Sequence, residues 1–258
     1  MPIKPALYFR ILCLSVFLWT SAVHAENKLY GVFLDPADSS EQLIADQLQN
    51  AEALSQATTL INQQFRLKNP IELVFGADDG PAFDPETYQI LIPYQFIEEV
   101  KQRFVDVEYA ETGVSIEDAT MDVLMHTLFH EIGHVLIPMF DLPVLGKEED
   151  AVDALATVLL IEFFEGGQEI ALSAADLFDL ESAERTELEE ADFWDEHSLD
   201  AQRYYSTLCH VYGSDPDAYG YIKQDAEFSD DRADLCIQEY ETTTESWFKV
   251  LVPYMKEA

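Results

Sequence analysis

The segment from His126 to Pro138 holds the densest group of chemically reactive side chains in the sequence. If it forms a helix, side chains four residues apart lie on the same face, so His130 and His134 can offer two imidazole nitrogens to one metal ion. Glu131 then points about 100° round the helix from His130, where its carboxylate can reach a water molecule at the metal. The H-E-x-x-H pattern therefore predicts metal-assisted hydrolysis, with two histidine ligands and Glu131 as the general base.

The flanking residues predict a helix around this motif. Ser115 is typical of a helix N-cap, and apolar residues recur at helical spacing over residues 121–136. We expect Pro138 to end the helix one turn after the motif. His126 is displaced by about 40° from the face of His130, so we expect it to pack or to support the site. A buried helix with hydrogen-bonded core histidines is the alternative interpretation of the whole segment.

A catalytic zinc ion usually has three protein ligands and one open position, so a third ligand is required. Residues 146–153 are rich in acids and open a predicted helix that runs to about residue 165. Glu149 and Asp153 are four apart on one face, so Glu149 can be the third ligand while Asp153 accepts the free ring N–H of a liganding histidine. Glu148 and Asp150 are expected to point elsewhere. Acids in a first helical turn also stabilise the helix dipole, and this alternative stays open.

Hydrolysis of a carbonyl also requires a donor for the developing oxyanion. Four side chains in one predicted amphipathic segment could supply it: His197, Arg203, Tyr204 and Tyr205. We take His197 as the preferred candidate.

Residues 1–25 have the pattern of a signal peptide. Lys4 and Arg10 precede an apolar run from Ile11 to Trp19, and the segment ends in small residues at Ala25. A membrane anchor is the competing interpretation, but the run is short for a bilayer span, and we expect no later stretch to be long enough. The sequence therefore predicts an exported protein, periplasmic or extracellular, that does not bind membranes after cleavage.

Export changes the interpretation of the three cysteines. Cys13 would be lost with the signal peptide, which leaves Cys209 and Cys236 in an oxidising compartment. We expect these two to form a disulfide; two separate buried thiols are the alternative.

The mature chain is strongly acidic. The signal segment carries two of the 14 Lys and Arg residues and none of the 50 Asp and Glu residues, so 12 basic residues remain against 50 acids, a net charge of −38. Such a surface repels the phosphates of nucleic acids and of anionic lipids. Nucleic acid is therefore excluded as a partner, and the sequence carries no signal for an oligomeric state.

The remaining sequence predicts strands before the motif and helices after it. Strands are expected at residues 28–34, 71–75 and 88–93, one helix with a continuous apolar stripe from Ser39 or Ser40 to about residue 69, and another at 95–104. Residues 76–85 are expected to be turns, and a closing helix is expected at 244–255. An edge strand above the metal helix would be able to hold an extended peptide by strand addition.

The chain resembles the gluzincin metallopeptidases, in which H-E-x-x-H is followed after a short loop by E-x-x-x-D, here at residues 130–134 and 149–153. It is similar, more closely, to a family of exported bacterial proteins that carries a domain-of-unknown-function label and is described as "putative metallopeptidases". The similarity covers most of the mature chain. It is carried by Gly-Pro-Ala-Phe-Asp-Pro at 80–85, by the two metal segments, and by residues 197–216.

The resemblance implies an α+β, zincin-like fold. A single domain over residues 26–258 would combine a small mixed sheet and the active-site helix (26–138) with a mainly helical part (139–258). It also implies a Zn²⁺ ion held by His130, His134 and Glu149, with Glu131 as general base. We therefore expect an exported zinc metallopeptidase that acts on peptides or proteins; the alternative is a non-catalytic envelope binding protein that keeps the fold and the metal.

Overall fold

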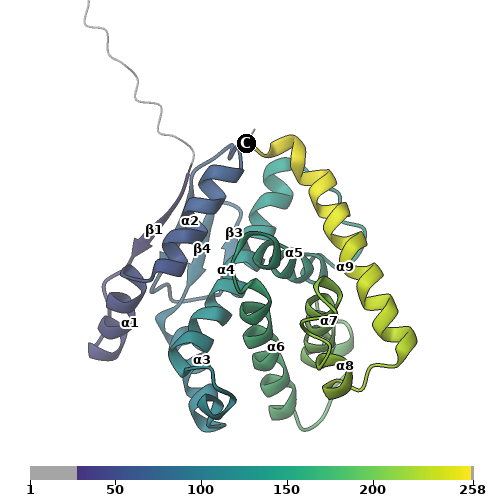
Figure 1. Ribbon diagram of the computed structural model, residues 1–258. Helices are drawn as coiled ribbons and strands as arrows, with labels where there is room; N and C mark the ends of the chain where they lie inside the picture. Colours follow the sequence, from purple (N-terminus) through teal and green to yellow (C-terminus); the bar gives the residue numbers. More distant parts are fainter. Residues whose placement is uncertain (1–27, 257–258) are drawn as a thin grey trace, which may run out of the picture.

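The computed structural model describes residues 28–256, and the predicted signal peptide lies outside this range. The chain is α+β, as predicted, with a small mixed sheet and a majority of helix (Figure 1). The strands are β1 (Leu29–Phe33), β2 (Ile71–Phe75), β3 (Ala82–Asp84) and β4 (Gln89–Ile92). The helices are α1 (Ser39–Gln49), α2 (Glu52–Gln64), α3 (Tyr94–Asp106), α4 (Ile116–Phe140), α5 (Glu148–Phe163), α6 (Gly167–Glu184), α7 (Asp200–Ser214), α8 (Ile222–Asp225) and α9 (Asp230–Leu251), with short 3₁₀ turns at Tyr109–Thr112, Ala191–Phe193 and Val252–Tyr254.

The sheet has the order β1-β2-β4-β3, in which β1, β2 and β4 run parallel and β3 runs antiparallel at one edge. The strand predicted at 88–93 is β4, which lies inside the sheet and is not its edge. Residues 76–85 are rich in turns, as expected, but they also contain β3, which the sequence did not indicate and which pairs with β4 through a tight connection. Asp84 stabilises that connection by accepting hydrogen bonds from the Glu86 backbone and the Thr87 hydroxyl at 2.8 Å each.

The helix expected from Ser39 or Ser40 to about residue 69 is two helices. Asp38, rather than a serine, caps α1 by accepting the backbone N–H groups of Ser40 and Glu41. The break falls at Asn50, whose side chain donates to the Asp46 carbonyl at 2.7 Å and so satisfies the end of α1. The apolar stripe continues across the break, which is why periodicity alone did not reveal it.

Helix α4 crosses the middle of the molecule and packs against α3, α5 and α6 (Figure 1). Ser115 caps it, as predicted, by accepting the backbone N–H of Asp118 at 3.0 Å. Pro138 does not end the helix as we expected, because α4 continues to Phe140 and ends where Asp141 adopts a left-handed conformation. A proline so near the end removes only one internal hydrogen bond, to the carbonyl four residues before it.

Among residues 28–256, α4 is the one helix long and apolar enough to cross a membrane by length and composition. The expectation that no later stretch would be long enough was therefore wrong. Its most apolar window has a mean hydropathy of 1.2, but 83% of that window is buried inside the protein. A helix that is apolar all round and covered by other helices is typical of a protein core.

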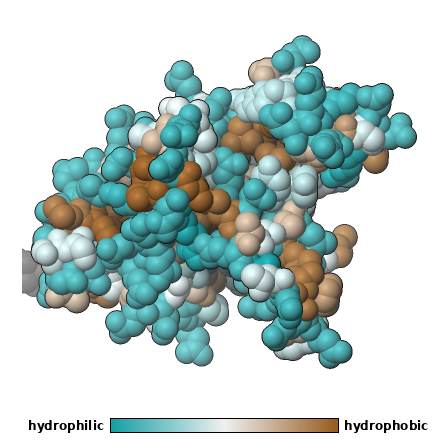
Figure 2. Space-filling model, turned by 90° about the horizontal axis from the view of Figure 1, so that it is seen from below, coloured by the Kyte–Doolittle hydropathy of each residue, from teal (hydrophilic) through white to brown (hydrophobic). Residues whose placement is uncertain are grey.

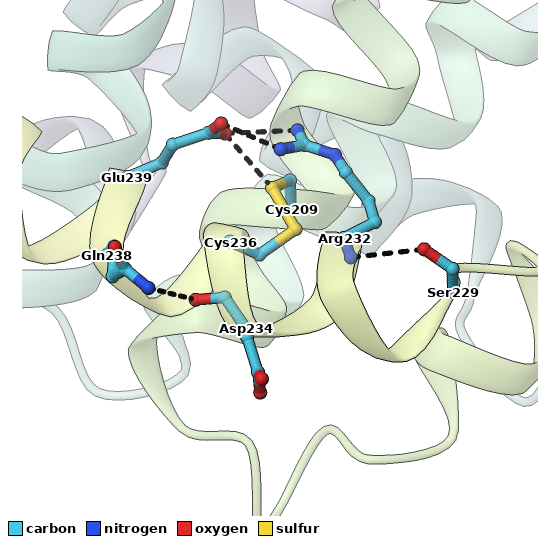
Figure 3. The surroundings of a disulfide bond; sticks show 7 residues. All are labelled: Cys209, Ser229, Arg232, Asp234, Cys236, Gln238 and Glu239. Carbon is cyan, nitrogen blue, oxygen red and sulfur yellow. Dashed lines mark hydrogen bonds and ion pairs between the residues drawn. A yellow bond between two sulfur atoms is a disulfide. The ribbon is translucent and has the colours of Figure 1, made fainter.

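The closing helix α9 begins fourteen residues earlier than predicted and ends close to the expected position. It is joined to α7 by the Cys209–Cys236 disulfide, whose sulfurs are 2.10 Å apart (Figure 3). Arg232 and Glu239 form a bidentate ion pair beside it, at 2.7 and 3.0 Å. A cross-link over 27 residues stabilises the folded state by about 3–4 kcal/mol in the chain-entropy account.

Candidate metal centre

Three segments bring the predicted site residues together. Helix α4 carries His130, Glu131 and His134, α5 carries Glu149, and the segment before α7 carries His197. The two helices approach closely because Gly133, between the two histidines, has no side chain. A Cβ at that position would lie 2.8 Å from the Cβ of Val152.

The candidate ligand atoms form a nearly equilateral triangle. The Nε2 atoms of His130 and His134 are 3.2 Å apart. Oε2 of Glu149 lies 3.2 Å from the first and 3.3 Å from the second. A zinc ion with bonds of about 2.0–2.1 Å places tetrahedral ligands about 3.3–3.4 Å from each other. Two imidazoles and a carboxylate at this spacing fit three corners of a zinc site.

The other ring nitrogens of these histidines are held by carboxylates. Nδ1 of His130 lies 2.7 Å from Oδ1 of Asp153, as the spacing of Asp153 predicted. Nδ1 of His134 lies 2.9 Å from Oε1 of Glu148. The expectation that Glu148 points elsewhere was wrong. The end of α4 passes the first turn of α5, so His134 comes within hydrogen-bond distance of Glu148. Both rings are thereby oriented with Nε2 toward Glu149.

Arg203 extends this support from α7. Its guanidinium donates to both oxygens of Asp153, at 2.7 and 2.9 Å, and its side chain is only 16% exposed. It also lies over the ring of Phe178, 3.9 Å from the centroid. Arg203 was one of four candidates for an oxyanion donor, but its position makes it the partner of Asp153. Arg203 and Asp153 are 50 residues apart in the sequence, so no local pattern predicted that they would pair.

Charge and burial oppose each other in this cluster. Burial works against ionised Glu149, yet hydrogen bonds from His130, His134 and His197 hold the pKa of its carboxyl well below the usual range. Burial lowers the pKa of His130, but its bonds to Asp153 and Glu149 outweigh that effect and raise it to about 9. The pKa of Asp153 is also lowered, against burial, by His130 and Arg203. The site thus attracts positive charge strongly.

Glu131 is buried at 5% exposure beside the triangle. Burial raises the pKa of its carboxyl, although a hydrogen bond from the backbone N–H of Phe83 in β3 partly offsets this. A buried carboxylate with a raised pKa beside a candidate metal position is suited to accept and release a proton. The cleft has a volume of about 710 Å³ and is lined by β3, both histidines, Glu131 and Glu149.

His197 lies at the mouth of the cleft, 42% exposed, with Nε2 3.1 Å from Oε2 of Glu149. That hydrogen bond raises the pKa of His197. Lys147 fixes the segment by donating to the carbonyls of Asp195 and His197, at 2.9 and 3.0 Å. His130, Glu149 and His197 each offer a ligand atom, and these atoms lie within 4.8 Å of one another. His197 can therefore serve either as a fourth ligand or as a proton donor.

The remaining candidates lie outside the triangle. His126 is buried and pairs with the Thr157 hydroxyl at 3.3 Å, a packing role as expected. The rings of Tyr204 and Tyr205 meet edge to face, and neither lines the cleft or the space beside it. Lys147, Glu148 and the β3 backbone are the contributors that the sequence did not indicate.

A largely apolar hollow of the surface is separate from this site. It has a volume of about 650 Å³, lies between α1, α3 and α4, and shares no lining residue with the cleft. Seen from below, apolar patches interrupt a mostly hydrophilic surface, with a large one toward the α1 and α3 side (Figure 2). The candidate ligands and Glu131 therefore line the cleft under β3 and not this hollow.

A family model, DUF4344, with the description "Putative metallopeptidase" matches residues 33–251. No curated protein and no solved structure matches the chain.

Proposed function

Because the chain belongs to the family described as "Putative metallopeptidase", we propose that it is an exported, zinc-dependent peptidase with a zincin-like fold and Glu131 as its general base. Family membership itself supports a metal-dependent hydrolase acting on peptides or proteins. The observation that carries the finer proposal is the triangle of His130, His134 and Glu149 beside a buried Glu131. Its edges have the length that zinc requires.

His130, His134 and Glu149 would hold the ion. When bound there, zinc supplies Lewis acidity, which lowers the pKa of water and polarises a carbonyl. Glu131 takes a proton from the attacking water and passes it to the nitrogen of the leaving amine. The raised pKa of its carboxyl suits both transfers.

His197 is proposed as the donor to the developing oxyanion, since a catalytic zinc keeps one position free of protein ligands. Its hydrogen bond to Glu149 raises its pKa and so favours the protonated, donating ring. Asp153 and Glu148 act as positioning residues, because each holds a ligand histidine by the nitrogen that faces away from the metal position.

We propose that substrate binds along β3, the edge strand that lines the cleft. An extended peptide can add to an open edge and receive backbone hydrogen bonds. Export is supported by the signal-like segment at residues 1–25 and by the Cys209–Cys236 disulfide, which is typical of oxidising compartments.

The test combines metal analysis with digestion of a peptide library. Purified mature protein should contain about one zinc ion per chain, the stoichiometry of one catalytic site. Glu131→Gln should keep that zinc and lose cleavage by about 10²-fold or more, the usual contribution of a general base. Glu149→Gln serves as the contrasting control, because it should lose the metal as well. Equal cleavage by wild type and Glu131→Gln would refute the assignment of the base.

A further inference from the structure

A small cavity of about 170 Å³ adjoins the cleft. Pro81, His130, Glu131 and His197 line both spaces, so the cavity lies directly beside the proposed reacting groups. A substrate side chain next to the scissile bond can turn from the cleft into it.

The size and the walls of the cavity suit one long, narrow side chain. At about 30 Å³ for each water in the liquid, it has room for roughly five or six non-hydrogen atoms. Polar and apolar side chains share its walls, and the apolar ones on α3, α4 and α6 are Phe96, Val123, Ala174, Leu177 and Phe178. The apolar part of the wall can take a methylene stem.

Glu181 of α6 lines the same cavity and is the acidic group in it besides Glu131. Its nearest cation is Arg103, 3.9 Å away, and Arg103 is already bonded to Glu184 at 3.2 Å. Arg203 also lines the cavity, but its charge is engaged by Asp153. Burial raises the pKa of Glu181, as expected for a carboxylate whose charge is incompletely compensated.

We propose that this cavity binds the basic side chain of a substrate residue next to the scissile bond, lysine in particular, with Glu181 pairing with its ammonium group. The apolar side chains of α3, α4 and α6 would contact the four methylene groups, and the Glu181 carboxylate would pair with the charge. The inference rests on the proposed peptidase function and adds a substrate class to it. The formal net charge of −36 also favours encounter with cationic peptides.

The experiment measures binding rather than turnover. Two blocked, fluorescently labelled pentapeptides carry lysine or the uncharged, nearly isosteric norleucine between pairs of alanines. Their dissociation constants are measured by anisotropy on zinc-loaded Glu131→Gln protein, which cannot consume them. The lysine peptide should bind at least about tenfold more tightly, the effect of one partly buried charge pair.

Two further substitutions in the same background locate the preference. Glu181→Gln should reduce the lysine preference to about twofold or less. Asp179→Asn removes one negative charge from the exposed side of the same helix, lines neither space, and should keep the full preference. Failure of both peptides to bind, a preference that survives Glu181→Gln, or one equally reduced by Asp179→Asn would overturn the proposal.

Digestion of the peptide library by wild type separates the two hypotheses. Cleavage without enrichment of basic residues next to the scissile bond would overturn the lysine pocket and leave the peptidase function intact. No cleavage, together with a lysine preference that depends on Glu181, would support the pocket and refute the peptidase function.

Discussion

Asp153→Asn tests whether the metal centre depends on the chain of contacts from Arg203 through Asp153 to His130. The carboxylate serves His130 with one oxygen and Arg203 with both, at 2.7 to 2.9 Å. Asparagine keeps the shape but has one neutral acceptor oxygen in place of two charged ones, so at least one of the three contacts is replaced by an NH₂ group that faces a donor. Loss of a partner that orients a ligand histidine typically weakens metal binding about 10- to 100-fold, or about 1.4–2.7 kcal/mol.

The same substitution should destabilise the zinc-free protein. Arg203 is 16% exposed and would keep its charge with at most one hydrogen bond from the new side chain. Removing one partner of a buried ion pair costs about 3–5 kcal/mol, and a retained hydrogen bond reduces this to about 2–3 kcal/mol.

Zinc affinity is measured by competition with a chromogenic chelator, and stability by urea unfolding of the zinc-free protein. Asp150→Asn, an exposed charge on the same helix, is the matched control and should change neither quantity. Arg203→Met should lower stability while it weakens zinc binding less than Asp153→Asn does, because Asp153 still holds His130. Wild-type zinc affinity in Asp153→Asn would refute the positioning role.

Two other perturbations address the helix contact and the buried histidine. Gly133→Ala should lower the free energy of unfolding by about 1–3 kcal/mol and weaken zinc binding, because its methyl group would meet Val152 at 2.8 Å. This clash outweighs the gain in helix propensity from alanine, about 1 kcal/mol. Gly146→Ala is the control: it has open space around it and should change neither quantity in the same urea and chelator assays. Burial lowers the pKa of His126 from 6.5 to about 4, so the unfolded chain takes up a proton at a higher pH than the folded protein does. The free energy of unfolding should therefore fall by about 3 kcal/mol as the pH drops from above 6.5 to 4. His126→Gln, which can keep the bond to Thr157, should remove that part of the pH dependence in urea unfolding between pH 6.5 and 4, and an unchanged pH profile would contradict the reasoning.

The sequence revealed the parts of the site that depend on helical spacing. His130, His134, Glu149 and Asp153 lie on predicted helices, and intervals of four residues place such side chains on one face regardless of the tertiary structure. The same logic correctly placed Ser115 as a helix cap. These are local relations, so a single sequence can express them.

What the sequence did not reveal depends on contacts between distant segments. Arg203 meets Asp153 across 50 residues, and β3 becomes an edge strand only because it pairs with β4. The role of Glu148 was missed for a related reason. Spacing within α5 shows that Glu148 points away from Asp153, but spacing cannot show that His134 of α4 lies beside Glu148. Helical periodicity predicts which face is apolar and leaves open what that face contacts.

The charges of the centre give an independent argument for a divalent ion. Glu131, Glu149 and Asp153 are three carboxylates in a largely buried region, and Arg203 supplies one permanent positive charge. With neutral histidines the cluster carries a net charge of −2, which is costly to bury unless it is compensated. A divalent cation would cancel this charge, and without one the protein can compensate by protonating its histidines, in keeping with the pKa of His130 at about 9, or the buried Glu131. Three carboxylates gathered round two histidines, with an excess of negative charge, are better explained by cation binding than by core packing.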